Sequence, residues 1–238
     1  QACHVVRAGD ERGRHHTPEF TLVEWYRTGY SMAQMAAEAA TFVDALLVAA
    51  GGEPRGFETL AYEEAVRRHA GIDPFAQDLG PLRDAAIALG LEARVAAASS
   101  RDELLDLLVA MRVGPALGHG RLCALTHYPA SQAALARLDP ADPRIALRFE
   151  LYGDGLELAN GFEELADSAE QAARFAADNA ERQARGHAAL PVDSRLLAAL
   201  AHGLPACSGV AVGFDRVAML ALGARHIDEV LAFPLERA

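Results

Sequence analysis

Two strand-like segments joined by a tight turn constrain the fold of this chain more than any other local pattern. The segments span 145–152 and 156–160, and Gly153-Asp154-Gly155 joins them. A short glycine-rich connection between two such runs predicts a β-hairpin. Further strand-like runs lie at 3–6, 21–30, 122–126 and 208–212. The sequence therefore predicts a sheet that is largely antiparallel.

Helical patterns lie between and after these strands. Ser31 can cap an apolar-periodic stretch at 32–50 that ends at two glycines, which predicts a helix. Shorter helical patterns are found at 59–70, 79–89, 101–112, 167–185, 194–201 and from Asp215 onward. The first three of these predict a helical insertion at about 55–115. Strands that alternate with helical insertions indicate one α+β domain over 1–238, since no repeat or linker divides it.

The charge balance narrows the possible partners and the compartment. The chain has 22 Lys and Arg residues against 33 Asp and Glu residues, for a formal net charge of −11. An acidic surface disfavours a large nucleic-acid interface, so we do not expect tRNA as a partner. No run reaches the roughly 18 apolar residues that span a membrane, and three widely spaced cysteines argue against a disulfide framework. We therefore expect a cytoplasmic protein without a membrane anchor.

A loop rich in cations separates the first two strand-like runs. It contains Arg7, Arg12, Arg14 and His15-His16. Arginine forks match phosphate oxygens in a bidentate fashion, so this loop is suited to a nucleotide. A solvated charged turn is the alternative, and for such a loop taken alone it is the commoner one.

The strand after this loop carries a second pattern. Alternation places Phe20, Leu22, Glu24 and Tyr26 on one face. A carboxylate among aromatic rings suits an ammonium group, which predicts an amine pocket. The alternative is an edge strand with one outward glutamate.

Acidic residues are spread over the predicted hairpin and the residues after it. They are Glu150, Glu157 and Glu164, with Asn160 between the last two. Hard oxygen ligands of this kind suit magnesium, which binds through one or two carboxylates and substrate phosphates. An exposed acidic hairpin in an acidic protein is the alternative, and it ranks first when these residues are taken alone.

A strand of small residues leads into the last predicted helix. The run Ser208 to Gly213 allows a ligand to approach the backbone closely, and Arg216 lies at the entry of an apolar helix, where a charge needs a partner. The alternative is a core strand and helix in which Arg216 pairs with Asp215 or with a terminal carboxylate.

These patterns together resemble a known family. Arg7 with residues 16–26 resembles motif 2 of the class II aminoacyl-tRNA synthetases of the lysyl type, and residues 209–216 resemble motif 3. Residues 157–167 resemble the lysine-binding segment of the same family. Three motifs in the family's order make the resemblance specific. Within the family, the chain is similar to the elongation factor P lysine ligases at 126–132, 155–162 and 207–211.

The resemblance implies an ATP site and a fold. It implies a class II synthetase-like antiparallel sheet flanked by helices, in a homodimer. It assigns the α-phosphate to Arg7, adenine to Phe20, and the γ-phosphate side to Arg216, with Arg7 and Arg216 as the catalytic residues. The residues implied to contact ATP are Arg7, Glu11, His16, Phe20, Glu150, Glu157 and Arg216. Either Asp10 or Glu11 would read the adenine amino group, and Glu150 and Glu157 would hold Mg2+.

The resemblance also implies an amino-acid site. Its residues would be Glu24, Tyr26, Asn160, Glu164 and Ala211. Lysyl-tRNA synthetases carry glycine where this chain has Ala211, so the added methyl would favour (R)-β-lysine over α-lysine. One methyl is worth roughly 1 to 3 kcal/mol of selectivity.

The implied reaction is ATP-dependent formation of a lysyl or (R)-β-lysyl adenylate, followed by transfer to a lysine of elongation factor P. The alternatives are a lysyl-tRNA synthetase core that charges tRNA and a catalytically inactive paralogue. The resemblance begins at motif 2, so we expect a catalytic domain that lacks motif 1 at its N-terminus. The loop between Arg7 and Phe20 is one residue longer than the family pattern, and Thr17 replaces its usual asparagine.

Overall fold

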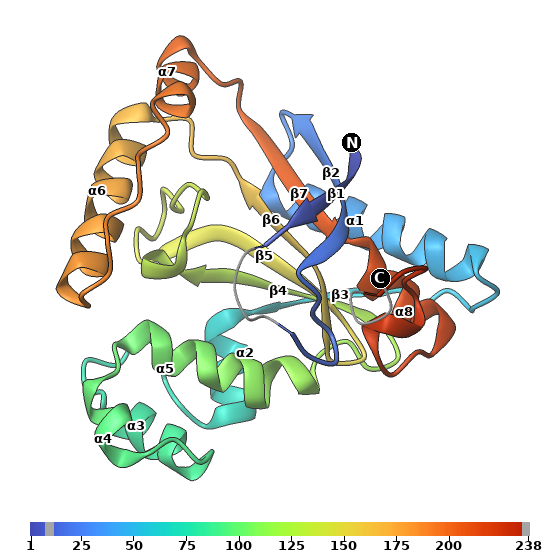
Figure 1. Cartoon of the computed structure of the whole chain (residues 1–238), viewed down its shortest axis with the longest axis horizontal. Coiled ribbons are helices and arrows are strands. Elements are labelled where there is room, and N and C mark those ends of the chain that lie inside the picture. Colours follow the sequence, from blue (N-terminus) through green and yellow to red (C-terminus); the bar gives the residue numbers. More distant parts are fainter. Residues whose placement is uncertain (8–11, 235–238) are drawn as a thin grey trace.

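One seven-stranded sheet organises the protein. The computed structural model describes residues 1–7 and 12–234 (Figure 1). The strands are β1 (Ala2–Val6), β2 (Glu19–Thr28), β3 (Phe57–Ala61), β4 (Leu122–Pro129), β5 (Ile145–Gly153), β6 (Leu156–Glu163) and β7 (Cys207–Gly213). Their order is β1-β2-β7-β6-β5-β4-β3. Neighbours are antiparallel except β3 and β4, which are parallel. The α+β class is confirmed, with one parallel pair in the sheet.

Helices connect and cover these strands. They are α1 (Met32–Ala49), α2 (Tyr62–Ala70), α3 (Gly80–Ala88), α4 (Ala93–Ala98), α5 (Arg101–Leu108), α6 (Ser168–Ala184), α7 (Ser194–His202) and α8 (Phe214–Leu222). Short helical turns follow at Val109–Val113, Gly114–Ala116, Ala130–Gln132 and Ile227–Glu229. The predicted helix at 59–70 is wrong at its start, because residues 59–61 pair with β4 as part of β3. Pairing with a neighbouring strand overrides local helical propensity here.

Helix α1 covers one face of the sheet. Ser31 caps it through a capping box with Gln34. Its residues Met35, Ala36 and Val43 are fully buried against Phe149, Leu151 and other apolar side chains of the sheet. By length and composition alone α1 could cross a membrane, but its apolar face is part of this core. Small residues such as Ala36 allow the helix to pack close to the strands.

The helices between β3 and β4 form a second layer on the opposite face, at one end of the sheet. Leu82, Leu104 and Leu108 pack with Cys123 and Leu125 of β4, in an apolar cluster separate from that of α1. Alternation along β4 explains the separation, since Leu122 and Ala124 face α1. These helices lie within the range 55–115 predicted as a helical insertion, which also contains β3, and they leave the central strands uncovered on that face.

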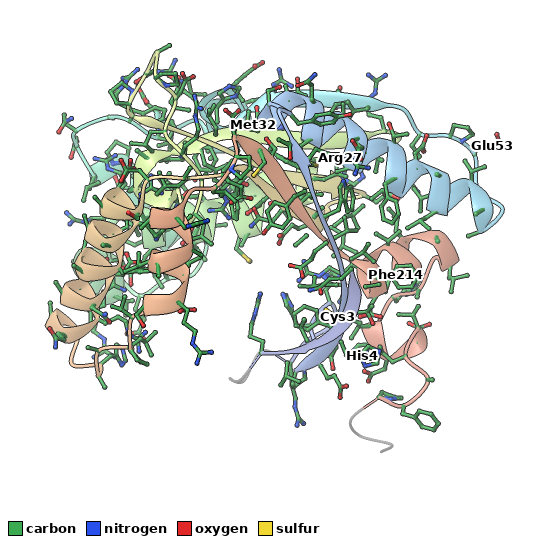
Figure 2. The ribbon with its side chains drawn as sticks, turned by 90° about the horizontal axis from the view of Figure 1, so that it is seen from above. Cys3, His4, Arg27, Met32, Glu53 and Phe214 are labelled. Atoms are coloured by element: carbon green, nitrogen blue, oxygen red, sulfur yellow. The ribbon has the colours of Figure 1, made fainter. Side chains whose placement is uncertain are left out.

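Helices α6 and α7 pack against each other at the edge of the molecule (Figure 1). Figure 2, seen from above, places this pair on the side away from Cys3, His4 and Phe214. Arg174 of α6 donates to the carbonyls of Ala134 and Ala136. Arg185, just after α6, pairs with Glu103 of α5 at 2.7 Å. These contacts tie the two helices to the rest of the fold.

Candidate active site

The strand register aligns four predicted site residues in one row across the sheet. Glu24 on β2 pairs with Ala211 on β7, Ala211 with Asn160 on β6, and Asn160 with Glu150 on β5. Their sequence neighbours Trp25 and Val210 pack toward α1. Since strand side chains alternate between faces, the row lies on the opposite, uncovered face.

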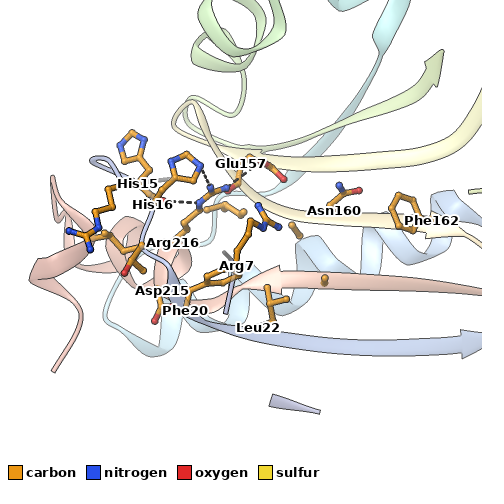
Figure 3. A pocket seen from close by; sticks show the side chains of 17 residues that line it. Arg7, His15, His16, Phe20, Leu22, Glu157, Asn160, Phe162, Asp215 and Arg216 are labelled. Atoms are coloured by element: carbon orange, nitrogen blue, oxygen red, sulfur yellow. Dashed lines mark hydrogen bonds and ion pairs between the residues drawn. The ribbon is translucent and has the colours of Figure 1, made fainter. Parts of the chain in front are cut away.

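A cavity of about 590 Å3 lies over the central strands (Figure 3). Residues from the cation-rich loop, from β2, β6 and β7, and from α8 line it. They include Arg7, Arg12, His15, His16, Phe20, Glu157, Asn160, Phe162, Ala211, Asp215 and Arg216. The cationic side chains gather at one end of it, so that end suits phosphate groups.

Arg216 is clamped between the loop and the hairpin. Its Nη1 donates to the Glu157 carbonyl at 2.9 Å and lies 3.3 Å from Glu157 Oε2. Its Nη2 lies 2.8 Å from His16 Nε2, and its Nε donates to the His15 carbonyl at 3.2 Å. A guanidinium only donates, so this His16 nitrogen is the acceptor. These hydrogen bonds fix the position of the Arg216 guanidinium in the wall of the cavity.

Asp215 links helix α8 to strand β2, which follows the cation-rich loop. It is 8% exposed, and its Oδ2 accepts the backbone N–H of Thr21 at 2.7 Å. This hydrogen bond fixes the start of α8 against β2. Its donor residue, Thr21, follows Phe20, and its acceptor residue precedes Arg216. Figure 3 shows both side chains at the same cavity. The sequence predicts Asp215 at the start of a helix and, in one alternative, as the ion-pair partner of Arg216, but in the structure Asp215 bonds to Thr21 and Arg216 pairs with Glu157.

Arg7 and Phe20 lie together at the cavity wall. The Arg7 guanidinium carbon lies 5.6 Å from the centroid of the Phe20 ring, and the Arg7 N–H donates to the Pro18 carbonyl at 2.9 Å. The other loop candidates, Asp10 and Glu11, lie outside the described residues. Arg12 and His15 also line the cavity; they belong to the loop predicted to suit a nucleotide, although the resemblance assigned them no contact with ATP. Partial burial lowers the pKa of His15, and the positive charges of the nearby Arg14 and Arg216 lower it further.

Beyond the other end of the cavity, two of the predicted amine-binding residues, Tyr26 and Glu164, lie over Gly209. Asn160 and Ala211, by contrast, line the cavity itself. A Cβ at Gly209 would stand 2.5 Å from the Tyr26 ring and 2.6 Å from Glu164 Oε1, so only glycine allows both side chains to approach. Burial raises the pKa of Glu164 to about 7. Within residues 1–7 and 12–234, Glu164 has no ion-pair partner and the buried Asn160 Oδ1 has no hydrogen-bond partner. This end therefore has acceptors for an ammonium group, and in the described part of the chain no ion pair of Glu164 occupies them.

Two carboxylates could hold a divalent cation. Glu150 and Glu157 lie on neighbouring strands of the hairpin. Enclosure by the protein raises the pKa of Glu157, and the nearby Glu150 carboxylate raises it further. Two hard oxygen donors that repel each other suit Mg2+ completed by phosphate oxygens and water. No group of three or more His, Cys, Asp or Glu that could bind a metal alone occurs among the described residues.

The chain is similar to a known family and to several named proteins. The family model for the class II tRNA synthetases (D, K and N) matches residues 1–237. The chain belongs to the class II tRNA synthetase family. Proteins named elongation factor P–(R)-beta-lysine ligase are 48% identical to it in Klebsiella pneumoniae subsp. pneumoniae and 46% identical in Salmonella dublin. Each alignment covers all of this chain and 71% of the relative.

As a class II synthetase, the chain carries the predicted motifs on the elements just described. Motif 2 lies on the cation-rich loop and β2, motif 3 on β7 and α8, and the lysine-site segment on β6. The structure brings all described candidates to one face of the sheet. It divides them between the main cavity, the amine end over Gly209 and a smaller cavity beside Glu150. The role of each residue stays a prediction, as do the exact domain limits.

Proposed function

We propose that this chain is an ATP-dependent ligase that activates (R)-β-lysine, or lysine, and transfers it to a lysine of elongation factor P. The observation that carries the proposal is the likeness, over all of this chain, to relatives of that name, at 46 to 48% identity. The site supports it physically, because a cation-rich end and a carboxylate end lie on one sheet face.

In the first step, a carboxylate oxygen of the amino acid attacks the α-phosphorus of ATP, and the bond to the β-phosphate oxygen breaks to release pyrophosphate. Arg7 and Arg216 would stabilise the charge that develops on the phosphates. Glu24, Tyr26, Asn160 and Glu164 would hold the amine so that the carboxylate points toward Arg7. Catalysis then rests on positioning and charge, without a protein nucleophile.

In the second step, the neutral amine of the acceptor lysine attacks the carbonyl carbon of the adenylate. The bond to the phosphate oxygen breaks, AMP leaves and an amide forms. We propose Mg2+ as a cofactor held by Glu150 and Glu157, where it would neutralise phosphate charge. A homodimer, a cytoplasmic location and the absence of a membrane partner belong to the same proposal.

Ala211 supports the choice of amino acid. It lies between Glu24 and Asn160 in the cross-strand row, in the floor of the cavity. The methyl group of Ala211 therefore makes the cavity shallower beside the amine-binding residues. A substrate whose amino group is attached at a different carbon then fits differently.

Acylation assays on purified protein test the proposal. With ATP, Mg2+ and (R)-β-lysine, we expect mass spectrometry to show one lysyl group on elongation factor P. Lysine tRNA in the same mixture should stay uncharged. Charging of tRNA without modification of the protein would identify a tRNA synthetase core instead. Failure with both acceptors and no adenylate formation would identify an inactive paralogue.

A further inference from the structure

Glu150 is fixed on both of its carboxylate oxygens. Arg148 Nη2 donates to Oε1 at 2.6 Å, and the Tyr152 hydroxyl donates to Oε2 at 2.7 Å. The side chains of Glu150 and Arg148 are 11% and 17% exposed. All three residues face the same side of β5, since they alternate along it. The carboxylate therefore has one orientation before any ligand binds.

Arg148 is itself immobilised. Its Nη1 donates to the Gln132 carbonyl at 2.8 Å, and its guanidinium carbon lies 4.4 Å from the centroid of the buried Tyr128 ring. The contact with a ring face and two hydrogen bonds determine the plane of the guanidinium. Arg148 is thus a rigid support for Glu150.

This support extends to the helical insertion. The Gln132 side chain donates to Asp106 of α5 at 2.8 Å, and the neighbouring Ser131 donates to Asp102 at 2.8 Å. A chain of hydrogen bonds therefore runs from α5 through Gln132 and Arg148 to Glu150. The insertion packs the β4 end of the sheet and also sets the position of a site carboxylate.

A second cavity of about 310 Å3 borders this network. Arg148, Glu150 and Tyr152 line it, and it shares Glu157, His16 and Arg216 with the main cavity. Glu150 therefore lines the second cavity rather than the main one, next to residues of the phosphate end that both cavities share. The two carboxylates differ in how tightly they are held, because Glu157 is 38% exposed and lies 3.3 Å from its arginine.

We infer that Arg148 and Tyr152 are positioning residues that orient Glu150 toward a magnesium ion bound with ATP. This inference rests on the proposed function. Glu150 is the fixed ligand, and Glu157 is the adjustable one. Arg148 also offsets part of the cost of burying the Glu150 charge in the absence of ATP. Residues that orient a metal ligand in this way typically change metal affinity by about 10- to 100-fold when replaced.

Calorimetric titration of ATP, with and without Mg2+ and without amino acid, tests the inference. Tyr152→Phe removes one hydroxyl and keeps the ring. We expect it to reduce the tightening of ATP binding by Mg2+ about 10-fold, while ATP binding without Mg2+ stays within twofold of wild type. Arg148→Met should have a larger effect, and Tyr152→Phe serves alone if that variant does not fold.

Tyr62→Phe is the matched control. Tyr62 is fully buried and lines the same cavity, but among the described residues its hydroxyl has no hydrogen-bond partner. Equal Mg2+ dependence in Tyr152→Phe and Tyr62→Phe would overturn the inference, as would wild-type ATP binding that ignores Mg2+. If wild type binds Mg2+ and ATP as expected but shows no lysine-dependent pyrophosphate exchange, the proposed function fails and the inference stands.

Discussion

The two ends of the site are built on opposite electrostatic principles. At the phosphate end, the two carboxylates proposed to hold Mg2+ already have arginine partners, Glu157 with Arg216 and Glu150 with Arg148. At the amine end, Glu164 is half-buried without such a partner among the described residues, and partial burial raises its pKa to about 7. The phosphate end is therefore organised before substrate binds, whereas the amine end depends on the cation that the substrate brings.

This difference separates the energetic roles of the two ends. A clamped arginine needs little reorganisation when phosphate charge develops, so its main contribution is to the transition state. An uncompensated carboxylate is costly in the free protein and is stabilised by a bound ammonium group, so its main contribution is to binding. Substitutions at the two ends should consequently change different kinetic constants.

The largest expected effect is at the phosphate end. Arg216→Ala removes the donors that bridge His16 and Glu157, and we expect kcat for adenylation to fall about 1000-fold with a smaller change in KM for lysine. Pyrophosphate exchange measures both constants. Arg121→Ala, which removes an exposed pair with Glu58, should leave them unchanged. Equal losses in the two variants would contradict an organised phosphate end.

The second effect is at the amine end. Glu164→Gln removes the carboxylate that would pair with the substrate ammonium, and we expect KM for the amino acid to rise about 100-fold, with little loss of ATP affinity. Glu163→Gln is the neighbouring control. Glu163 accepts the Met32 N–H at the start of α1 and pairs with Arg137, so its replacement should lower thermal stability without raising KM.

Ala211→Gly should have a more moderate effect. It removes the one methyl group between Glu24 and Asn160 in the row, and we expect the ratio of kcat/KM for (R)-β-lysine over α-lysine to fall about 10-fold. Competition between the two amino acids in the exchange assay measures this ratio. An unchanged ratio would show that selectivity resides elsewhere at the amine end.

The smallest effect is a dependence on pH. An ammonium group pairs with the ionised form of Glu164, so a pKa of about 7 predicts binding roughly fivefold weaker at pH 6.3 than at pH 8. The same raised pKa stabilises the folded protein fully below pH 4.5, and this contribution is lost as the pH rises through 7. Calorimetry at several pH values should show both trends, and Glu164→Gln should remove them. Binding of the amino acid that does not change with pH in wild type would argue against this role.

The sequence could predict which candidate residues share a strand face, because alternation along a strand is a local property. The run from Phe20 to Tyr26 determines which side chains share a face of β2, and the Gly-Asp-Gly turn brings β5 beside β6. The resemblance to the motifs of one family then implied roles for residues whose types alone left several roles open. Most helices of the insertion were also recognisable from apolar spacing.

Other features depend on contacts between distant segments. The last three residues of β3 were predicted as helix because the pairing of this strand with β4 spans more than 60 residues of sequence. The bond from Thr21 to Asp215 and the support of Arg148 by Gln132 likewise become visible only in three dimensions. Arg148 lies two residues before Glu150 on the same strand face, so alternation could have identified it.

Amino-acid-dependent exchange of pyrophosphate into ATP tests the central claim most directly. Purified protein is compared with (R)-β-lysine, with α-lysine and with no amino acid, and Arg216→Ala serves as the inactive control. The account predicts exchange that requires a lysine, favours (R)-β-lysine and disappears in the variant. Exchange with neither amino acid, or a clear preference for α-lysine, would contradict it.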